Sequence, residues 1–105
     1  MQIWDPKGGH PDAKMGSGGL WNNKKGSKGR DPLVLADSSV GGWNKIFVRM
    51  KGDKVTVILN GKTVVAEAPL QNYFDKGGPL PEKGSIQSQT HGAEISWRNP
   101  EVREL

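Results

Sequence analysis

The sequence contains no cysteine, so neither a disulfide nor a thiolate metal site can hold this 105-residue chain together. No apolar run approaches the roughly 20 residues of a membrane-spanning helix, and the first residues show no signal-peptide pattern. Hydrophobic residues make up only 33% of the chain, which is too little for two separate cores. We therefore expect one loop-rich domain over residues 1–105, with no membrane span.

The formal charge is +4, and much of it comes from lysines scattered among fifteen glycines. A basic excess favours polyanionic partners. However, the strip of aromatic and basic side chains that is typical of RNA- and DNA-binding modules is missing. Scattered lysines are typical of solvated loops, so we expect no nucleic-acid partner.

Residues 43–66 carry the clearest pattern in the chain. Apolar residues recur at every second position in two runs separated by Gly52-Asp53, and Asn60-Gly61 precedes a third run, Thr63–Val65. Asn-Gly is the strongest hairpin signal, because both residues tolerate the positive φ of a type I′ turn. The many β-branched residues argue against a helix, so we predict a three-stranded antiparallel meander. Its buried face is expected to comprise Ile46, Val48, Met50, Val55, Val57 and Leu59.

Shorter alternating segments predict further strands. Pro6 ends the first of them, because proline cannot donate to a strand ladder. Leu33–Leu35 fits either an edge strand or a packed turn. The expected strands are Met1–Asp5, Ser85–Gln89, Ala93–Trp97 and Val102–Leu105, with Ile3, Ile86, Trp43 and Trp97 in the core.

Between the first strand and the meander, residues 7–30 form a glycine-rich stretch with little periodicity. Loops of this length inside a compact domain are usually functional or disordered. Trp21 argues against disorder, because an indole needs a surface to lie on. It is expected either to close over a ligand or to anchor the loop.

The order of four segments resembles one known family. They are Gln2-Ile3-Trp4-Asp5, Val-Thr-Val-Ile-Leu-Asn-Gly-Lys-Thr-Val-Val at 55–65, Ile-Gln-Ser-Gln-Thr-His-Gly at 86–92, and residues 97–105 with Trp97-Arg98-Asn99 and Val102-Arg103-Glu104-Leu105. Together they resemble the C-terminal half of the 3-keto-disaccharide hydrolase family, long catalogued as a domain of unknown function. The resemblance covers nearly all of this chain and about half of a family domain.

This resemblance implies a fold and an activity. The fold is an all-β antiparallel sandwich, a concanavalin A-like jelly roll, of which this chain would be an incomplete, C-terminal portion. The activity is cleavage of glycosides whose sugar carries a 3-keto group, by hydrolysis or by elimination followed by hydration. The resemblance also implies a bacterial protein in the periplasm or outside the cell.

The residues themselves point to a carbohydrate partner. If Ile3 and Ile86 face the core, then Gln2 and Trp4 face away from it. The same alternation turns Gln87, Gln89 and His91 outward on the later strand. Amides bind hydroxyl pairs, and an indole stacks on the C–H face of a pyranose. Glutamines on an ordinary solvated strand face are the alternative interpretation.

Catalysis is expected to involve His91 and Asp5. Histidine changes protonation near neutrality, so His91 suits an acid or a base, the alternative being a turn residue before Gly92. A 3-keto group acidifies the neighbouring C–H, so one base can start elimination without the two carboxylates of ordinary glycosidases. Asp5 and His10 could assist this base or hold a divalent metal ion, although loop polarity explains both residues equally well.

The remaining candidate is Arg98, which fits either a clamp on a sugar oxygen or an arginine whose stem covers the strand. Neither a serine nucleophile arrangement nor a phosphate-binding glycine loop is visible in the sequence. The sequence thus favours a glycoside-cleaving enzyme module. A non-catalytic carbohydrate-binding sandwich module is the alternative, and a fragment that cannot bury its sheets alone is a third.

Overall fold

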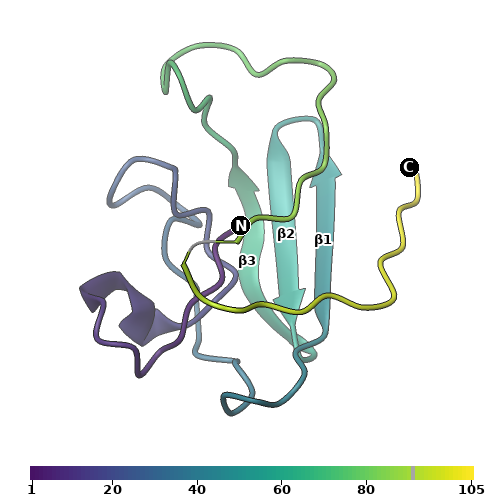
Figure 1. Ribbon diagram of the computed structural model, residues 1–105. Helices are drawn as coiled ribbons and strands as arrows, with labels where there is room; N and C mark the ends of the chain where they lie inside the picture. Colours follow the sequence, from purple (N-terminus) through teal and green to yellow (C-terminus); the bar gives the residue numbers. More distant parts are fainter. Residues whose placement is uncertain (91) are drawn as a thin grey trace.

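The structure is a computed structural model that describes residues 1–90 and 92–105. Its regular elements are a short 3-10 helix, η1 (Pro11–Met15), and the strands β1 (Ile46–Lys51), β2 (Lys54–Leu59) and β3 (Lys62–Pro69). The strands form one antiparallel sheet in the order β1-β2-β3 (Figure 1). The chain is therefore mostly non-helical and consistent with an all-β fold, and the predicted meander is confirmed.

Both hairpin turns follow the predicted chemistry. Lys51 pairs with Lys54 across the first turn, where Gly52 takes a φ of 60°. In the second turn Asn60 and Gly61 have φ values of 50° and 81°, as a type I′ turn requires. The Asn60 side chain also accepts a hydrogen bond from the Lys45 N–H at 2.9 Å and donates to the Ala36 carbonyl at 2.8 Å. The turn therefore fixes the loop that leads into β1.

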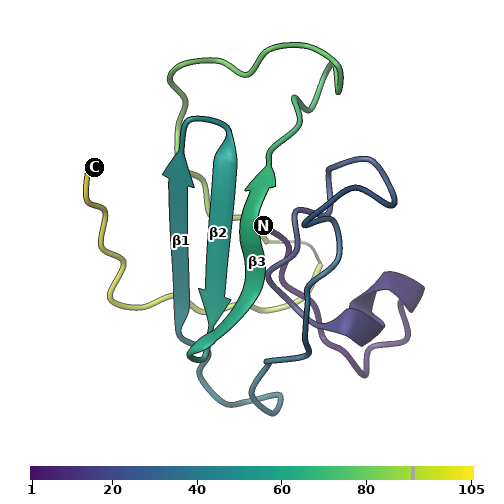
Figure 2. The same cartoon turned by 180° about the vertical axis from the view of Figure 1, so that it is seen from behind.

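The core lies on the inner face of β2 and β3, where residues 16–36 cover it. Gly18 and Gly29 bring this loop close to the sheet. A Cβ on Gly18 would stand 2.5 Å from Val64 Cγ2, and one on Gly29 would stand 2.4 Å from Ala68 Cβ. From behind, the loop runs beside β3, on the side of the sheet opposite β1 (Figure 2). The buried cluster comprises Leu20, Ala36, Val55, Val57, Leu59, Val64, Val65 and Ala68.

Irregular pairing in β3 accounts for two neighbouring buried residues. Val57 pairs with Val65 and Ile58 with Thr63, so Val64 is an extra residue on its strand. In a regular strand consecutive side chains point to opposite faces. The irregularity instead lets Val64 and Val65 both be fully buried.

The predicted inner face of β1 is only partly confirmed. Ile46 packs against the core, but Val48 and Met50 are about half exposed. The loops that cover β2 and β3 do not extend as far as β1, which explains the difference. Among residues 1–90 and 92–105, no backbone hydrogen bond reaches the outer edge of β1. This strand is therefore an open edge.

The predicted first strand is wrong, because residues 1–5 do not form one. They run extended beside residues 18–19, held by hydrogen bonds from Gln2 N to Gly19 O and from Gly18 N to Gln2 O, both 2.9 Å. Beyond Gln2 the Trp4 main chain bonds to the Ser17 side chain and not to its backbone, so no ladder develops. Ile3 is half-buried. Leu33–Leu35 forms neither an edge strand nor a packed turn: it is a bend whose three side chains are exposed, joined to β3 by a hydrogen bond from Leu33 N to Val64 O.

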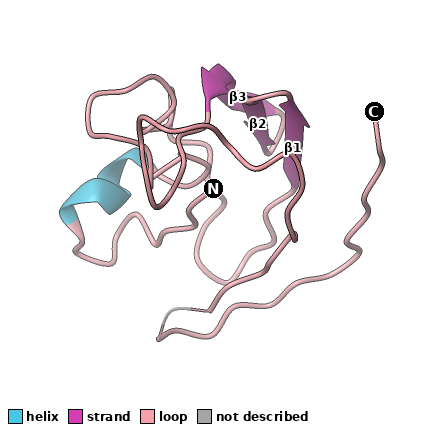
Figure 3. Cartoon of the chain, turned by 90° about the horizontal axis from the view of Figure 1, so that it is seen from above, coloured by secondary structure: helices cyan, strands magenta, loops and turns pink. Residues whose placement is uncertain are grey.

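The three strands predicted after residue 84 are also wrong where the structure describes them. Residues 85–90 and 92–105 contain no strand, and Ile86, expected in the core, is 79% exposed. Each segment has too few apolar side chains to offset the entropy lost on ordering the backbone. Seen from above, the C-terminal segment runs apart from the sheet (Figure 3).

Trp43 and Trp97, predicted in the core, are both about half exposed. The Trp43 ring instead carries the Arg98 guanidinium, whose central carbon lies 4.0 Å from the ring centroid. A cation above an indole is attracted by the ring quadrupole. Trp43 therefore packs against the side chain of Arg98 and not against the core.

Candidate functional site

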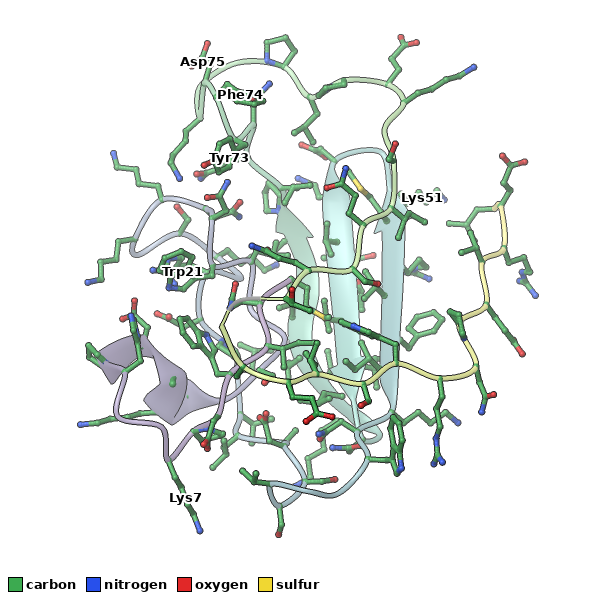
Figure 4. All side chains as sticks on the ribbon, in the orientation of Figure 1. Lys7, Trp21, Lys51, Tyr73, Phe74 and Asp75 are labelled. Carbon is green, nitrogen blue, oxygen red and sulfur yellow. The ribbon has the colours of Figure 1, made fainter. Side chains whose placement is uncertain are left out.

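Three aromatic side chains predicted to bind substrate or metal meet on one side of the molecule. Trp4 stacks on His10 with 4.6 Å between ring centroids and 24° between planes. Trp21 meets Trp4 edge to face at 5.7 Å and 80°. We call Trp4, His10 and Trp21 the aromatic cluster. Figure 4 shows the Trp21 indole on the side that carries η1, away from Lys51 at the end of β1.

Helix η1 fixes two of these rings through one residue. His10 caps the helix, and its Nδ1 accepts a hydrogen bond from the Asp12 backbone N–H at 3.2 Å. Trp21 Nε1 donates to Asp12 Oδ2 at 3.0 Å. Asp12 therefore orients His10 with its main chain and Trp21 with its carboxylate.

Arg30 completes the support of Trp21. Its guanidinium carbon lies 5.0 Å from the Trp21 ring centroid, and Nη2 lies 3.4 Å from Asp12 Oδ2. The hydrogen bond from the Trp21 indole lowers the pKa of Asp12 below its ordinary value. Smaller contributions from Arg30 and from the positive charge of Lys25 act in the same direction. Asp12 is thus held as a carboxylate between an indole N–H and a guanidinium.

Ser17 connects Trp4 to a second carboxylate. The buried Ser17 hydroxyl accepts from the Trp4 N–H at 2.8 Å and donates to the Trp4 carbonyl at 3.2 Å. The Ser17 N–H donates to Asp37 Oδ1 at 2.8 Å. A Cβ on Gly16 would lie 2.4 Å from that same oxygen. Asp37 is therefore held against the segment that carries the aromatic cluster.

A groove of about 390 Å³ begins at Asp5, the residue after Trp4, and none of the three cluster residues lines it. This volume lies within the range of small-molecule sites, roughly 300–1,000 Å³. One Asp5 oxygen accepts from the Lys7 N–H at 2.9 Å. The groove thus presents two carboxylates beside hydroxyls and an apolar strip. Its walls include Asp5, Asp37, Ser38, Ser39, Leu35 and Val40.

The structure separates the other predicted site residues from this groove. The Gln2 side chain donates to its neighbouring Ile3 carbonyl at 3.1 Å, and Arg98 covers Trp43. Gln87 and Gln89 are exposed on the segment without strands. The expected strand face shared with Gln2 is therefore not formed. His91, the predicted acid or base, lies outside the described residues.

Sequence reasoning missed Asp12, Ser17, Arg30 and Asp37. A proline-aspartate pair after His10 is a helix-start signal that could have pointed to Asp12. Arg30 and Asp37 follow irregular loops, where no periodicity tells which side chain faces inward. Only the loop path over β3 brings them to the cluster.

Two further findings concern metal ligands and membrane spans. In the described part of the chain, no three His, Asp or Glu side chains come together as metal ligands. His10 Nδ1 and one Asp5 oxygen already accept backbone N–H groups. Each residue has a second ring nitrogen or carboxylate oxygen beyond these contacts, so the metal site at Asp5 and His10 stays a prediction. The helix in residues 1–90 and 92–105 is far too short and polar to cross a membrane.

A second groove, of about 740 Å³, separates the end of β1 from the C-terminal residues. It is lined by Arg49, Met50 and Lys51 on one side and by Arg103, Glu104 and Leu105 on the other. None of the predicted site residues that the structure describes lines it. The candidate site is therefore the aromatic cluster with its adjoining groove.

Comparison with known proteins gives one match. Residues 1–103 match the family described as the 3-keto-alpha-glucoside-1,2-lyase-like domain. Neither a curated protein nor a solved structure matches the chain. The family match extends over nearly the whole sequence and agrees with the resemblance drawn from its motifs. The chain belongs to the 3-keto-alpha-glucoside-1,2-lyase-like domain family.

Proposed function

We propose that this domain binds and cleaves 3-keto-glycosides at the aromatic cluster and the groove beside it. One observation carries the proposal: in a member of this family two indoles, Trp4 and Trp21, meet directly before Asp5, which lines a groove together with a second carboxylate, Asp37. Indole faces stack on the apolar C–H side of a pyranose, while carboxylates and hydroxyls bind its polar edge.

The proposed reaction begins with a proton transfer. The 3-keto group acidifies the C2–H, and a carboxylate removes that proton to leave an enolate. The enolate electrons then form the C1–C2 double bond while the C1–O bond breaks, and the leaving oxygen takes a proton. Addition of water to this double bond would complete net hydrolysis. Asp5 is the proposed base, because one of its oxygens lies free of the Lys7 contact in the groove.

His91 remains the predicted acid or base, and in this reaction we assign it the proton transfer to the leaving oxygen. Gln2, Gln87, Gln89 and Arg98 remain predicted sugar contacts. We also infer that the sheet is one layer of a concanavalin A-like sandwich. The bare apolar side chains of Val48 and Met50 on β1 support this inference, because a second layer would cover them. The family resemblance further suggests a periplasmic or extracellular location.

The function is tested by incubating the protein with 3-keto-glucosides, with and without a chelator, and measuring free aglycone. Asp5→Asn and His91→Ala are each expected to lower turnover by about 10²-fold or more. Glu82→Gln, an exposed carboxylate outside both grooves, is the matched control. Circular dichroism of each variant checks that the fold is intact. Turnover at the wild-type rate in Asp5→Asn would contradict the role of Asp5.

A non-catalytic carbohydrate-binding module is the second candidate. The aromatic cluster favours it, because stacking indoles suffice to bind sugar without any acid or base. Calorimetry against glucosides and 3-keto-glucosides separates the two functions. Binding that depends on Trp21 but releases no aglycone would identify a binding module. Release of aglycone would identify an enzyme.

A further inference from the structure

Two side chains, Asp12 and Arg30, hold the Trp21 indole in place on its glycine-rich loop. Its ring is 38% exposed, yet the Nε1–H donates to Asp12 and the guanidinium of Arg30 lies over the ring. The Arg30 side chain is itself only 8% exposed. One exposed indole is thus held by a largely buried guanidinium and a partly exposed carboxylate.

This arrangement has a cost for folding. Burying a guanidinium is unfavourable unless its N–H groups are bonded. Among the described residues, 1–90 and 92–105, Nη1 of Arg30 is buried without a hydrogen-bond partner, and its ion-pair distance to Asp31 is 3.7 Å. A leucine in place of Arg30 would fill the space without that penalty. Packing therefore does not explain why a charged pair, Asp12 and Arg30, stands at this position.

The result is a fixed angle between two indoles. Trp4 is held by Ser17 and by stacking on His10, while Trp21 is held by Asp12 and Arg30. Their planes stand 80° apart. His10 covers one face of Trp4 and Arg30 covers one face of Trp21. A corner of this kind would therefore use a remaining ring face to stack on a sugar and the other ring to limit its lateral position. Rigid binding groups lose less entropy when a ligand binds.

We propose that Asp12 and Arg30 are positioning residues that fix Trp21 as one wall of a corner for a pyranoside with an apolar C–H face. This inference rests on the proposed function, because the sugar that fills the corner is the glycoside cleaved in the adjoining groove. Neither residue touches the reacting atoms. They act through Trp21 and are expected to change KM more than kcat.

The test uses the full chain with Trp43→Phe and Trp97→Phe, which leaves only Trp4 and Trp21 as indoles. Asp12→Ala removes the acceptor for Trp21 Nε1, whereas Asp12→Asn keeps an oxygen that can accept it. Asp31→Asn is the matched control, because Asp31 pairs with Arg30 but Trp21 donates to Asp12. The readouts are the Trp–Trp couplet in circular dichroism, acrylamide quenching, and KM and kcat with a 3-keto-glucoside.

Asp12→Ala is expected to weaken the couplet, increase quenching and raise KM about 3- to 10-fold, with kcat changed less than KM. Asp12→Asn is expected to restore much of the couplet and of the KM. If the wild type turns over substrate and Asp12→Ala matches it in couplet and KM, the positioning role is wrong while the proposed function stands. Equal effects of Asp31→Asn and Asp12→Ala would also overturn it. A wild-type protein that neither binds nor cleaves the glycoside would overturn both proposals.

Discussion

Residues 54–69 and residues 84–105 both alternate apolar with polar side chains, yet they lie in opposite environments. In the first region Val55, Val57 and Leu59 are buried, and a tight Asn-Gly turn leads directly into the next strand. In the second region, outside residue 91, every side chain except Ile95 is largely exposed. Alternation therefore produces a sheet only where apolar residues are dense and a tight turn returns the chain to a partner.

The largest expected effect is a loss of stability on substitution in the buried core of the sheet. Leu59→Ala should lower the free energy of unfolding by about 2–5 kcal/mol, because it opens a cavity in the covered face of β2. Ile86→Ala, made in the exposed region, should change it by less than about 0.5 kcal/mol. Urea unfolding followed by circular dichroism measures both values. Equal losses in the two variants would show that the C-terminal region is packed after all.

The second effect concerns the turn that joins β2 to β3. Asn60→Ala removes the contacts to Lys45 and Ala36 and places alanine at a φ of 50°. We expect a loss of about 1–3 kcal/mol in unfolding free energy. Asn60→Gly tolerates the φ but still lacks the amide, so it separates the backbone contribution from the hydrogen bonds. A Gly variant as stable as the wild type would show that the amide contacts contribute nothing.

A third, smaller effect is the pH dependence of Trp21 fluorescence in the aromatic cluster. Folding lowers the pKa of Asp12, so its contribution is fully present above the ordinary carboxyl pKa and is lost as pH falls through the lowered value. Trp21 emission and quenching should therefore stay constant from neutrality into the mildly acidic range and change at lower pH. In Asp12→Asn this change should disappear. A transition of equal size in Asp12→Asn would assign it to another group.

The smallest effect is expected in the exposed region. Arg98→Ala removes the cation above Trp43 and should lower the unfolding free energy by about 0.5–1 kcal/mol at most. Arg98→Lys keeps the charge and should lose less. Trp43 emission, recorded with Trp97→Phe, checks the contact directly. An unchanged emission spectrum in Arg98→Ala would show that the guanidinium does not rest on the ring in solution.

The sequence allowed the sheet to be predicted almost residue by residue, because period, β-branching and turn chemistry agreed over residues 46–65. It failed at β1, where Val48 and Met50 have the right period but no covering layer. Burial depends on which loop lies over a strand, and residues 16–36 give no periodic signal for their path. The later strands were predicted from single apolar residues such as Ile86, whose spacing alone could not reveal that they lack a partner.

The sequence identified several residues of the candidate site, but it did not predict how they lie relative to one another. Trp4, Asp5, His10 and Trp21 were all identified as functional candidates, on the chemistry of aromatic and titratable side chains. Their meeting depends on the η1 cap and on hydrogen bonds from Ser17 and Trp21, which are tertiary contacts. Asp37 became visible as a candidate only through the groove that it shares with Asp5.

The open edge of β1 has a consequence for how the protein behaves in concentrated solution. A regular strand with free N–H and C=O groups is a template for pairing between molecules. Here exposed lysines, Lys45 and Lys51, stand just before β1 and at its end, while Arg49 pairs with Glu67, so neighbouring molecules repel one another at low ionic strength. Salt shortens the range of that repulsion. Light scattering should therefore report growing self-association as sodium chloride is added, which makes storage in dilute buffer the better choice.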